Sequence, residues 1–192
     1  MSTLFIDTTK FITIGLLDSD FRWLDYSRFD ELKASAAVHF KIYEILKKYN
    51  LQIEELEQII YMAGPGSYTG MRVSEGMADI FKMAKIPVYS FYHFQVPNML
   101  NIKSGVWKSD AFKKEVFLYS WNSDGHSQKL IKKEDDDLSD YYSSFDDMGT
   151  IGSTDLMIKK NSSSILRQVV ESNLEEKLYY YRSIDDEYKV QK

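Results

Sequence analysis

The sequence predicts an α/β fold, and three patterns support this prediction. Short runs of β-branched and aromatic residues occur near the N-terminus, at residues 3–7 and 11–17, and are typical of strands. A helical pattern over residues 71–84 lies between apolar runs at residues 59–63 and 87–91, which predicts a strand–helix–strand unit with a right-handed crossover. The second half of the chain again combines strand-like and helix-like patterns.

The N-terminal runs predict a hairpin whose tip carries one carboxylate and two hydroxyls, at Asp7, Thr8 and Thr9. A third run around residues 21–26 is placed to extend this hairpin into a meander. The first sheet is therefore expected to begin with antiparallel strands.

A helix predicted over residues 30–49 carries two apolar stripes at helical spacing. An apolar arc of this width has two interpretations: the helix is wedged between two layers of its own fold, or its second stripe packs on another protein chain. The first stripe holds Leu32, Ala36, His39, Phe40, Tyr43 and Leu46, and the second holds Val38, Ile42, Ile45 and Tyr49.

A glycine-rich segment, residues 64–70, leads into the helix at residues 71–84, for which Thr69 is the predicted N-cap. Its glycines favour a sharp turn and a close approach to the helix or to a ligand. The spacing does not fit a P-loop, which needs Lys and then Ser or Thr after its last glycine, because Met71 and Arg72 follow Gly70. It does not fit the dinucleotide-binding fingerprint either, because that motif has one residue fewer before its last glycine. A structural turn and an anion site at a helix N-terminus both stay open.

The second half is less regular. Alternation of small or aliphatic with aromatic side chains predicts a strand at residues 115–121. The other predicted elements are a strand at residues 105–108, a short helix at 138–142 after an acidic run at 134–137, a helix at 162–171 and a terminal aromatic segment at 178–182.

Composition limits the functions open to this chain of 192 residues. Hydrophobic residues make up 44% and aromatic residues 15%, which supports a packed core. A net charge of −5 disfavours autonomous binding to nucleic acids, because phosphate binding needs a basic surface. The absence of cysteine excludes disulfides, thiolate zinc sites and cysteine nucleophiles. With neither a long apolar run nor a signal peptide, a cytoplasmic protein without membrane contact is expected.

Catalytic patterns are sparse. The histidines at positions 39, 93 and 126 have no metal-ligand spacing, so no metal site is expected. Ser67 directly follows Gly66 and does not match a nucleophile elbow. The residues alone do not indicate a complete enzyme.

Residues 64–73, Gly-Pro-Gly-Ser-Tyr-Thr-Gly-Met-Arg-Val, resemble the GPGSFTGxR signature of the bacterial TsaB family, with Tyr68 in place of Phe. Four further segments resemble elements of that family: residues 6–9 its opening IDTS, residues 86–88 the segment after the signature, residues 109–117 a second-lobe element and residues 180–182 its closing YxR.

The resemblance implies an actin-like ATPase (ASKHA, ribonuclease H-like) fold, with two lobes of mixed β-sheet flanked by helices and a reduced second lobe. Residues 1–98 would form the N-terminal lobe, and residues 99–192 the smaller C-terminal lobe. It also implies a non-catalytic partner subunit in bacterial synthesis of N6-threonylcarbamoyladenosine beside the tRNA anticodon. Such a subunit pairs with and activates its catalytic paralogue TsaD, and the ATPase TsaE joins them.

Further expectations follow from the resemblance. The chain would form a homodimer when alone, would contact tRNA only indirectly and would need no cofactor of its own, with ATP or ADP at the interface of the complex. Asp7 and Thr8 would be remnants of a nucleotide site. The catalytic relative carries a His-x-x-x-His metal pair, but Pro97 stands four residues after His93 here, so His93 is expected to be a capping or core residue.

The site residues fall into two groups. The residues expected to form a signature loop, an anion site or an interface are Gly64, Pro65, Gly66, Ser67, Tyr68, Thr69, Gly70 and Arg72. The residues expected to contact the partner from the two predicted helices are Phe40, Tyr43, Leu46, Val73, Met77 and Phe81. Arg72 is placed to pair with a carboxylate across the interface.

Two alternatives stay open. The first is an actin-like phosphotransferase that binds ATP between its lobes, with Asp7 and Thr8 orienting metal and phosphate. Its second-lobe phosphate loop would be residues 149–154, which equally predict a turn between strands. The second is a homodimeric interaction module outside tRNA modification.

Overall fold

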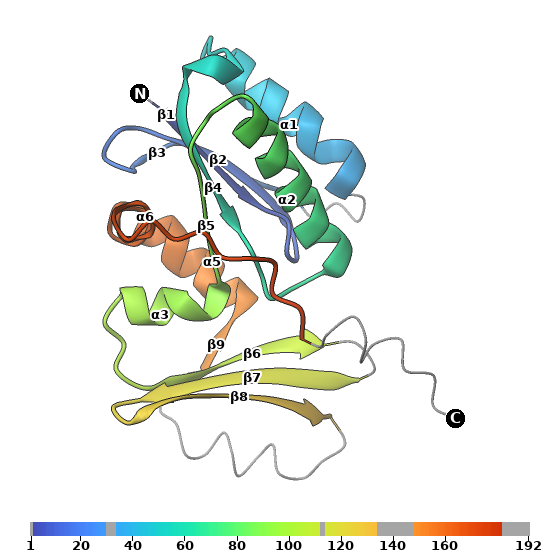
Figure 1. Ribbon diagram of the computed structural model, residues 1–192, viewed down its shortest axis with the longest axis vertical. Coiled ribbons are helices and arrows are strands. Elements are labelled where there is room, and N and C mark those ends of the chain that lie inside the picture. The colour runs from blue at the N-terminus through green and yellow to red at the C-terminus, as the bar shows by residue number, and fades with distance from the viewer. Residues whose placement is uncertain (1, 30–33, 112–113, 134–147, 182–192) are drawn as a thin grey trace.

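The computed structural model describes residues 2–29, 34–111, 114–133 and 148–181. Within these residues two mixed β-sheets, one in each lobe, lie with helices between them (Figure 1). This arrangement confirms the predicted α/β fold. None of the described helices has both the length and the apolar character that crossing a membrane requires.

The described strands of the first sheet are β1 (Ser2–Asp7), β2 (Ile12–Leu17), β3 (Trp23–Phe29), β4 (Leu56–Met62) and β5 (Val88–Phe91). Their order is β3-β2-β1-β4-β5. β1, β2 and β3 are antiparallel, so the predicted N-terminal meander is confirmed. β4 and β5 continue the sheet parallel to β1, as the crossover unit requires.

Two helices, α1 (Ala34–Lys48) and α2 (Tyr68–Met83), cover one face of this sheet (Figure 1). α2 is the predicted crossover between β4 and β5, but it begins earlier than expected. The prediction of Thr69 as N-cap is wrong, because Ser67 Oγ accepts a hydrogen bond from the Gly70 N–H at 3.3 Å. The core between helices and sheet includes Leu4, Ile14, Val38, Ile42, Ile59 and Phe81.

The opposite face of the first sheet is covered by helices from the end of the chain, α5 (Ile151–Lys160) and α6 (Ser162–Glu171) (Figure 1). α6 has the predicted bounds. Residues 151–171, which the sequence analysis placed in the C-terminal lobe, therefore pack on the first sheet, because strands buried on both faces need apolar cover on both sides. The residues packed together there include Phe5, Ile60, Met62, Phe91, Ile158, Ile165, Leu166 and Val169.

The described strands of the second sheet are β6 (Gly105–Ala111), β7 (Glu115–Asn122), β8 (Gly125–Lys132) and β9 (Met148–Thr150). They follow a 3-10 turn (His93–Gln95) and the short helix α3 (Val96–Met99), and their order is β8-β7-β6-β9. The predicted acidic run at 134–137 and helix at 138–142 lie outside the described residues. On the sheet's inner face, Trp107, Phe117, Tyr119 and Trp121 form an aromatic cluster with Phe94 of the 3-10 turn.

Candidate functional site

The tip of the β1–β2 hairpin and the glycine-rich loop are packed directly against each other. The Ser67 N–H donates to Thr9 O at 2.6 Å, and the Thr8 hydroxyl donates to Gly70 O. Thr8 Oγ1 also lies 2.7 Å from Ser74 Oγ on α2. Hairpin, loop and helix therefore form one continuous packing unit.

Two glycines allow this close packing. A Cβ at Gly70 would lie 1.8 Å from Thr8 O, and a Cβ at Gly66 would lie 2.7 Å from Thr9 O, both closer than side chains approach backbone oxygens. The loop also contains a cis peptide bond between Gly64 and Pro65. Because the glycines face the chain's own hairpin, the geometry favours a structural turn over an anion site.

The residues predicted as remnants of a nucleotide site, Asp7 and Thr8, are both buried. Asp7 Oδ1 accepts hydrogen bonds from the Thr9 N–H at 2.8 Å and from the Thr9 hydroxyl at 2.7 Å. Since the polar groups of both residues bind this chain itself, a nucleotide role for them stays a prediction that the geometry does not favour.

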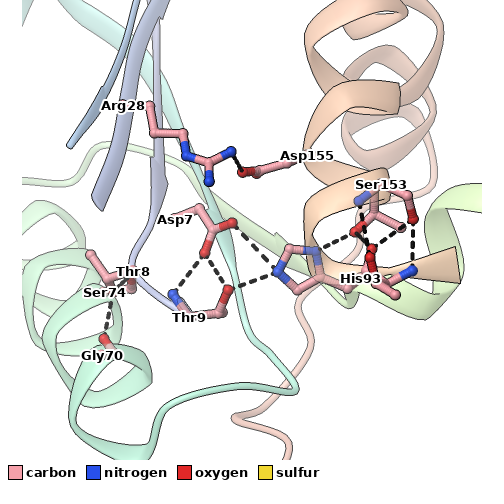
Figure 2. A network of polar contacts seen from close by, with 11 residues as sticks. Asp7, Thr8, Thr9, Arg28, Gly70, Ser74, His93, Ser153 and Asp155 are labelled. Carbon is pink, nitrogen blue, oxygen red and sulfur yellow. Dashed lines mark hydrogen bonds and ion pairs between the residues drawn. The ribbon is translucent and has the colours of Figure 1, made fainter. Parts of the chain in front are cut away.

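Asp7 belongs to a buried polar network that reaches from β1 to α5 (Figure 2). The Thr9 hydroxyl lies 2.8 Å from His93 Nε2, and His93 Nδ1 lies 2.8 Å from Thr154 Oγ1. His93 Nε2 is also 3.4 Å from Asp7 Oδ2. The imidazole is fully buried. The prediction of a capping or core role for His93 is therefore confirmed.

The hydrogen bonds assign one tautomer to His93. Burial lowers the pKa of His93 to about 4, so the ring is neutral at pH 7. The Thr9 hydroxyl donates its proton to Asp7 and must therefore accept from Nε2–H of His93. Nδ1 then accepts from the Thr154 hydroxyl at 2.8 Å, a shorter distance than the 3.1 Å from this hydroxyl to Thr150 O.

A second carboxylate, Asp155 on α5, lies beside this network (Figure 2). Arg28 Nη1 is 3.4 Å from Asp155 Oδ2, and the guanidinium lies 3.5 Å from the centre of the Phe11 ring. Burial raises the pKa of Asp7 and of Asp155 above the ordinary range, and repulsion by Asp7 adds to the shift of Asp155. Within the described residues, no group of three His, Asp or Glu side chains is placed to hold a metal ion.

Residues 149–154, the candidate phosphate loop, end β9 and begin α5 rather than joining two strands. The Thr150 hydroxyl accepts from the Ser153 N–H at 3.3 Å, and Ser153 Oγ accepts from the Thr150 N–H at 2.6 Å. This reciprocal pair is a capping box, which satisfies the amides of Thr150 and Ser153 within the chain.

Exposed apolar side chains lie on the outer sides of α1 and α2. Phe40 and Tyr43 on α1 are 57% and 58% exposed. Ile80 and Met83 on α2, which the sequence analysis did not assign to an interface, are 52% and 84% exposed. We call these four residues the helical surface.

Three of the predicted partner residues are unavailable at that surface. Leu46, Met77 and Phe81 are at most 7% exposed and belong to the core between the helices and the first sheet. These three residues are therefore core residues rather than interface residues, because their side chains pack toward the sheet. Val73 is half-buried and packs against the same core.

Arg72 pairs within its own chain. Its Nη1 lies 3.1 Å from Glu75 Oε2 on the next turn of α2. The guanidinium also lies 5.6 Å from the ring centres of Tyr68 and Tyr180, and the two rings are 5.4 Å apart. Tyr68 is exposed, so this cluster lies at the surface, at the start of α2.

Comparisons with known proteins agree with this architecture. The family model described as "TsaD: tRNA N6-adenosine threonylcarbamoyltransferase" matches residues 35–101. YeaZ from Pseudomonas aeruginosa superposes with a TM-score of 0.55 at 17% identity, covering 70% of this chain and 69% of that chain.

A second structure, an uncharacterized protein with similarity to peptidase YEAZ from Pseudomonas aeruginosa, has a TM-score of 0.59 at 16% identity, covering 94% of this chain and 99% of that chain. No curated protein matches the chain. The chain therefore shares the overall fold of these two YeaZ-like structures, and residues 35–101 match the TsaD family model.

Proposed function

We propose that this chain is a non-catalytic partner subunit of a TsaD-type enzyme that forms N6-threonylcarbamoyladenosine in tRNA. The proposal rests on the YeaZ-like fold of the chain. In this fold the signature loop packs on its own hairpin and begins a helix that has exposed apolar residues. The segment that matches the TsaD family model, residues 35–101, includes the loop, α2 and nearly all of α1.

The helical surface is the proposed contact with TsaD. Phe40, Tyr43, Ile80 and Met83 expose large apolar groups. They belong to α1 and α2, which are neighbouring helices at the outside of the first lobe (Figure 1). Large side chains of this kind contribute most of the binding energy at protein interfaces when a partner removes them from water. Without TsaD, the same surface is proposed to pair two copies of this chain.

The internal bonding of the hairpin supports a subunit without its own catalysis. In a phosphotransferase, a carboxylate and a hydroxyl at the hairpin tip would need to face metal and phosphate. Here the Thr8 hydroxyl is bonded to α2, and Asp7 is bonded to Thr9. Nucleotide, TsaE and tRNA contacts are therefore proposed to belong to the complex. Calorimetry with ATP and Mg²⁺ on the isolated chain should show no tight binding.

A binding experiment with substitutions tests the interface directly. The double variant Phe40→Ala/Met83→Ala should weaken binding to purified TsaD at least about tenfold in analytical ultracentrifugation. The control is Leu156→Ala, which truncates a 55% exposed side chain on α5 and should leave binding unchanged. Failure of the wild-type chain to bind TsaD, or equal binding by the double variant, would overturn this assignment.

A further inference from the structure

The last described residues, 174–181, form an extended segment that runs from α6 along the first lobe to the second sheet (Figure 1). We call it the strap. The Ser90 N–H donates to Leu174 O at 2.9 Å, and the Glu176 N–H donates to Ser90 O at 3.4 Å. This pairing is parallel and uses the edge of β5 that is not paired with β4.

Further along, the strap is hydrogen-bonded to the residues that directly follow β4 and β5. The Tyr179 N–H donates to Ala63 O at 2.9 Å, immediately before the signature loop. The Tyr92 hydroxyl donates to Lys177 O at 2.8 Å. The backbone of the strap is thus fixed to the first lobe over most of its length.

Alternate side chains of the strap pack on the first lobe. Leu178 is buried in the core beneath α1 and α2, and Tyr180 packs against that same core. Tyr180 also forms the exposed cluster with Tyr68 and Arg72 at the start of α2. Two side chains on one side of an extended segment therefore contact the lobe that holds the helical surface.

The intervening side chains pack on the second sheet. The rings of Tyr179 and Tyr181 each lie 5.3 Å from the ring of Phe117 on β7. The Tyr181 hydroxyl lies 2.6 Å from Ser109 Oγ on β6, and the Tyr179 hydroxyl donates to Gln128 on β8. The two-residue period of an extended chain thus sends successive side chains into different lobes.

We propose that the strap couples the two lobes, so that the packing of β6 controls the stability of the signature loop. Loss of the Ser109 hydroxyl removes a contact that holds Tyr181 in place. Because Tyr181 and Tyr179 share one backbone segment, this loss should also weaken the hydrogen bond from the Tyr179 N–H to Ala63 O beside the loop. In the opposite direction, a partner that contacts Tyr68 acts on Tyr180 and then on β6. This last step rests on the proposed function, whereas the coupling does not.

Amide hydrogen exchange of the full chain, followed by NMR without any partner, tests the coupling. Ser109→Ala removes the hydroxyl that meets Tyr181 but leaves the strap and the first lobe unaltered. The reporters are the amides of Tyr179, which donates to Ala63 O, and of Ser67, which donates to Thr9 O. Both should exchange roughly threefold to tenfold faster, as expected for loss of one hydrogen bond that restrains opening.

The matched control is Ser127→Ala, which removes a hydroxyl contact of 2.8 Å with Ser120 on the face of the same sheet opposite to the strap. It should leave both reporter amides at their wild-type rates. The coupling is overturned if Ser109→Ala leaves both reporter rates unchanged, whatever happens within β6. It is also overturned if Ser127→Ala accelerates the reporters equally. Neither result depends on whether the chain binds TsaD.

Discussion

The backbone oxygen of Thr8 occupies the space that a side chain at Gly70 would need. The helix that begins at the loop cannot shift to make room, because the Thr8 hydroxyl is bonded to Gly70 O and lies beside Ser74. The sequence identified this glycine as important. It did not reveal that the neighbouring group is the chain's own hairpin rather than a ligand.

Gly70→Ala should therefore lower the free energy of unfolding by about 2–4 kcal/mol, through overpacking against a backbone that cannot move away. Gly76→Ala on the same helix is the control, because its added Cβ would meet nothing within 4 Å. That substitution should be neutral or stabilise by up to about 1 kcal/mol. Urea unfolding measures both values, and equal effects would contradict the packing described for the loop.

His93 should stay neutral down to about pH 5, because burial lowers its pKa from 6.5 to about 4, and its proton should lie on Nε2 while the Asp7 carboxyl group is ionised. Nitrogen chemical shifts of the imidazole report both the tautomer and the titration midpoint. A midpoint near 6.5, or a proton on Nδ1, would contradict the assigned direction of the hydrogen bonds.

The same shifts give the sign of the pH dependence of stability. Protonation of His93 opposes folding, so its contribution falls as the pH drops from 6.5 toward 4. The pKa values of Asp7 and Asp155 are raised on folding, so their contributions instead increase as the pH falls below those raised values. In mildly acidic solution, protonation of His93 therefore lowers the stability of the fold, whereas protonation of Asp7 and Asp155 raises it.

Helix α1 shows that residues on one predicted apolar stripe can differ in burial. The pattern placed Phe40, Tyr43 and Leu46 on one stripe, but the first two are exposed and Leu46 is buried. The stripe is wide, and only its packing on the first sheet decides where the boundary between core and surface falls. Sequence periodicity alone does not contain that information.

Two substitutions on α1 separate these roles. Leu46→Ala should reduce the free energy of unfolding by about 2–5 kcal/mol, since it leaves a cavity in the core. Phe40→Ala should change it by no more than about 0.5 kcal/mol, since the ring is 57% exposed. Denaturant unfolding of the isolated chain measures both, and comparable losses would show that Phe40 is a core residue.

Elements with strong apolar patterns were predicted well, including β1, β4, β5, β7 and α6. β8 was missed because most of its side chains are polar and exposed, and it is a strand only through pairing with β7. β9 and α5 were missed because Gly149 and the hydroxyl residues after it are typical of a loop. In the structure, Thr150 and Ser153 instead form the capping box that begins α5. The sequence predicted that Asp7 lies at the hairpin tip. It did not predict the buried network around Asp7, because the contact of His93 with Thr154 on α5 depends on long-range packing.

For the whole molecule, the cover of the first sheet by α5 and α6 makes the two halves of the sequence interdependent. A fragment of residues 1–98 would expose Phe5, Ile60, Met62 and Phe91 to water. This fragment should show no cooperative thermal unfolding by circular dichroism and poor dispersion of its NMR amide signals. A folded fragment would instead support the lobe boundary that the sequence suggested.

We propose that this chain acts in tRNA modification through TsaD, without catalysis of its own. The most direct measurement is formation of N6-threonylcarbamoyladenosine in tRNA from threonylcarbamoyl-adenylate, with TsaD, TsaE and this chain supplied together or singly. We expect product only when TsaD and this chain are both present, and much less product with Phe40→Ala/Met83→Ala. Product formed by this chain without TsaD, or by TsaD and TsaE equally well without this chain, would contradict the proposed role.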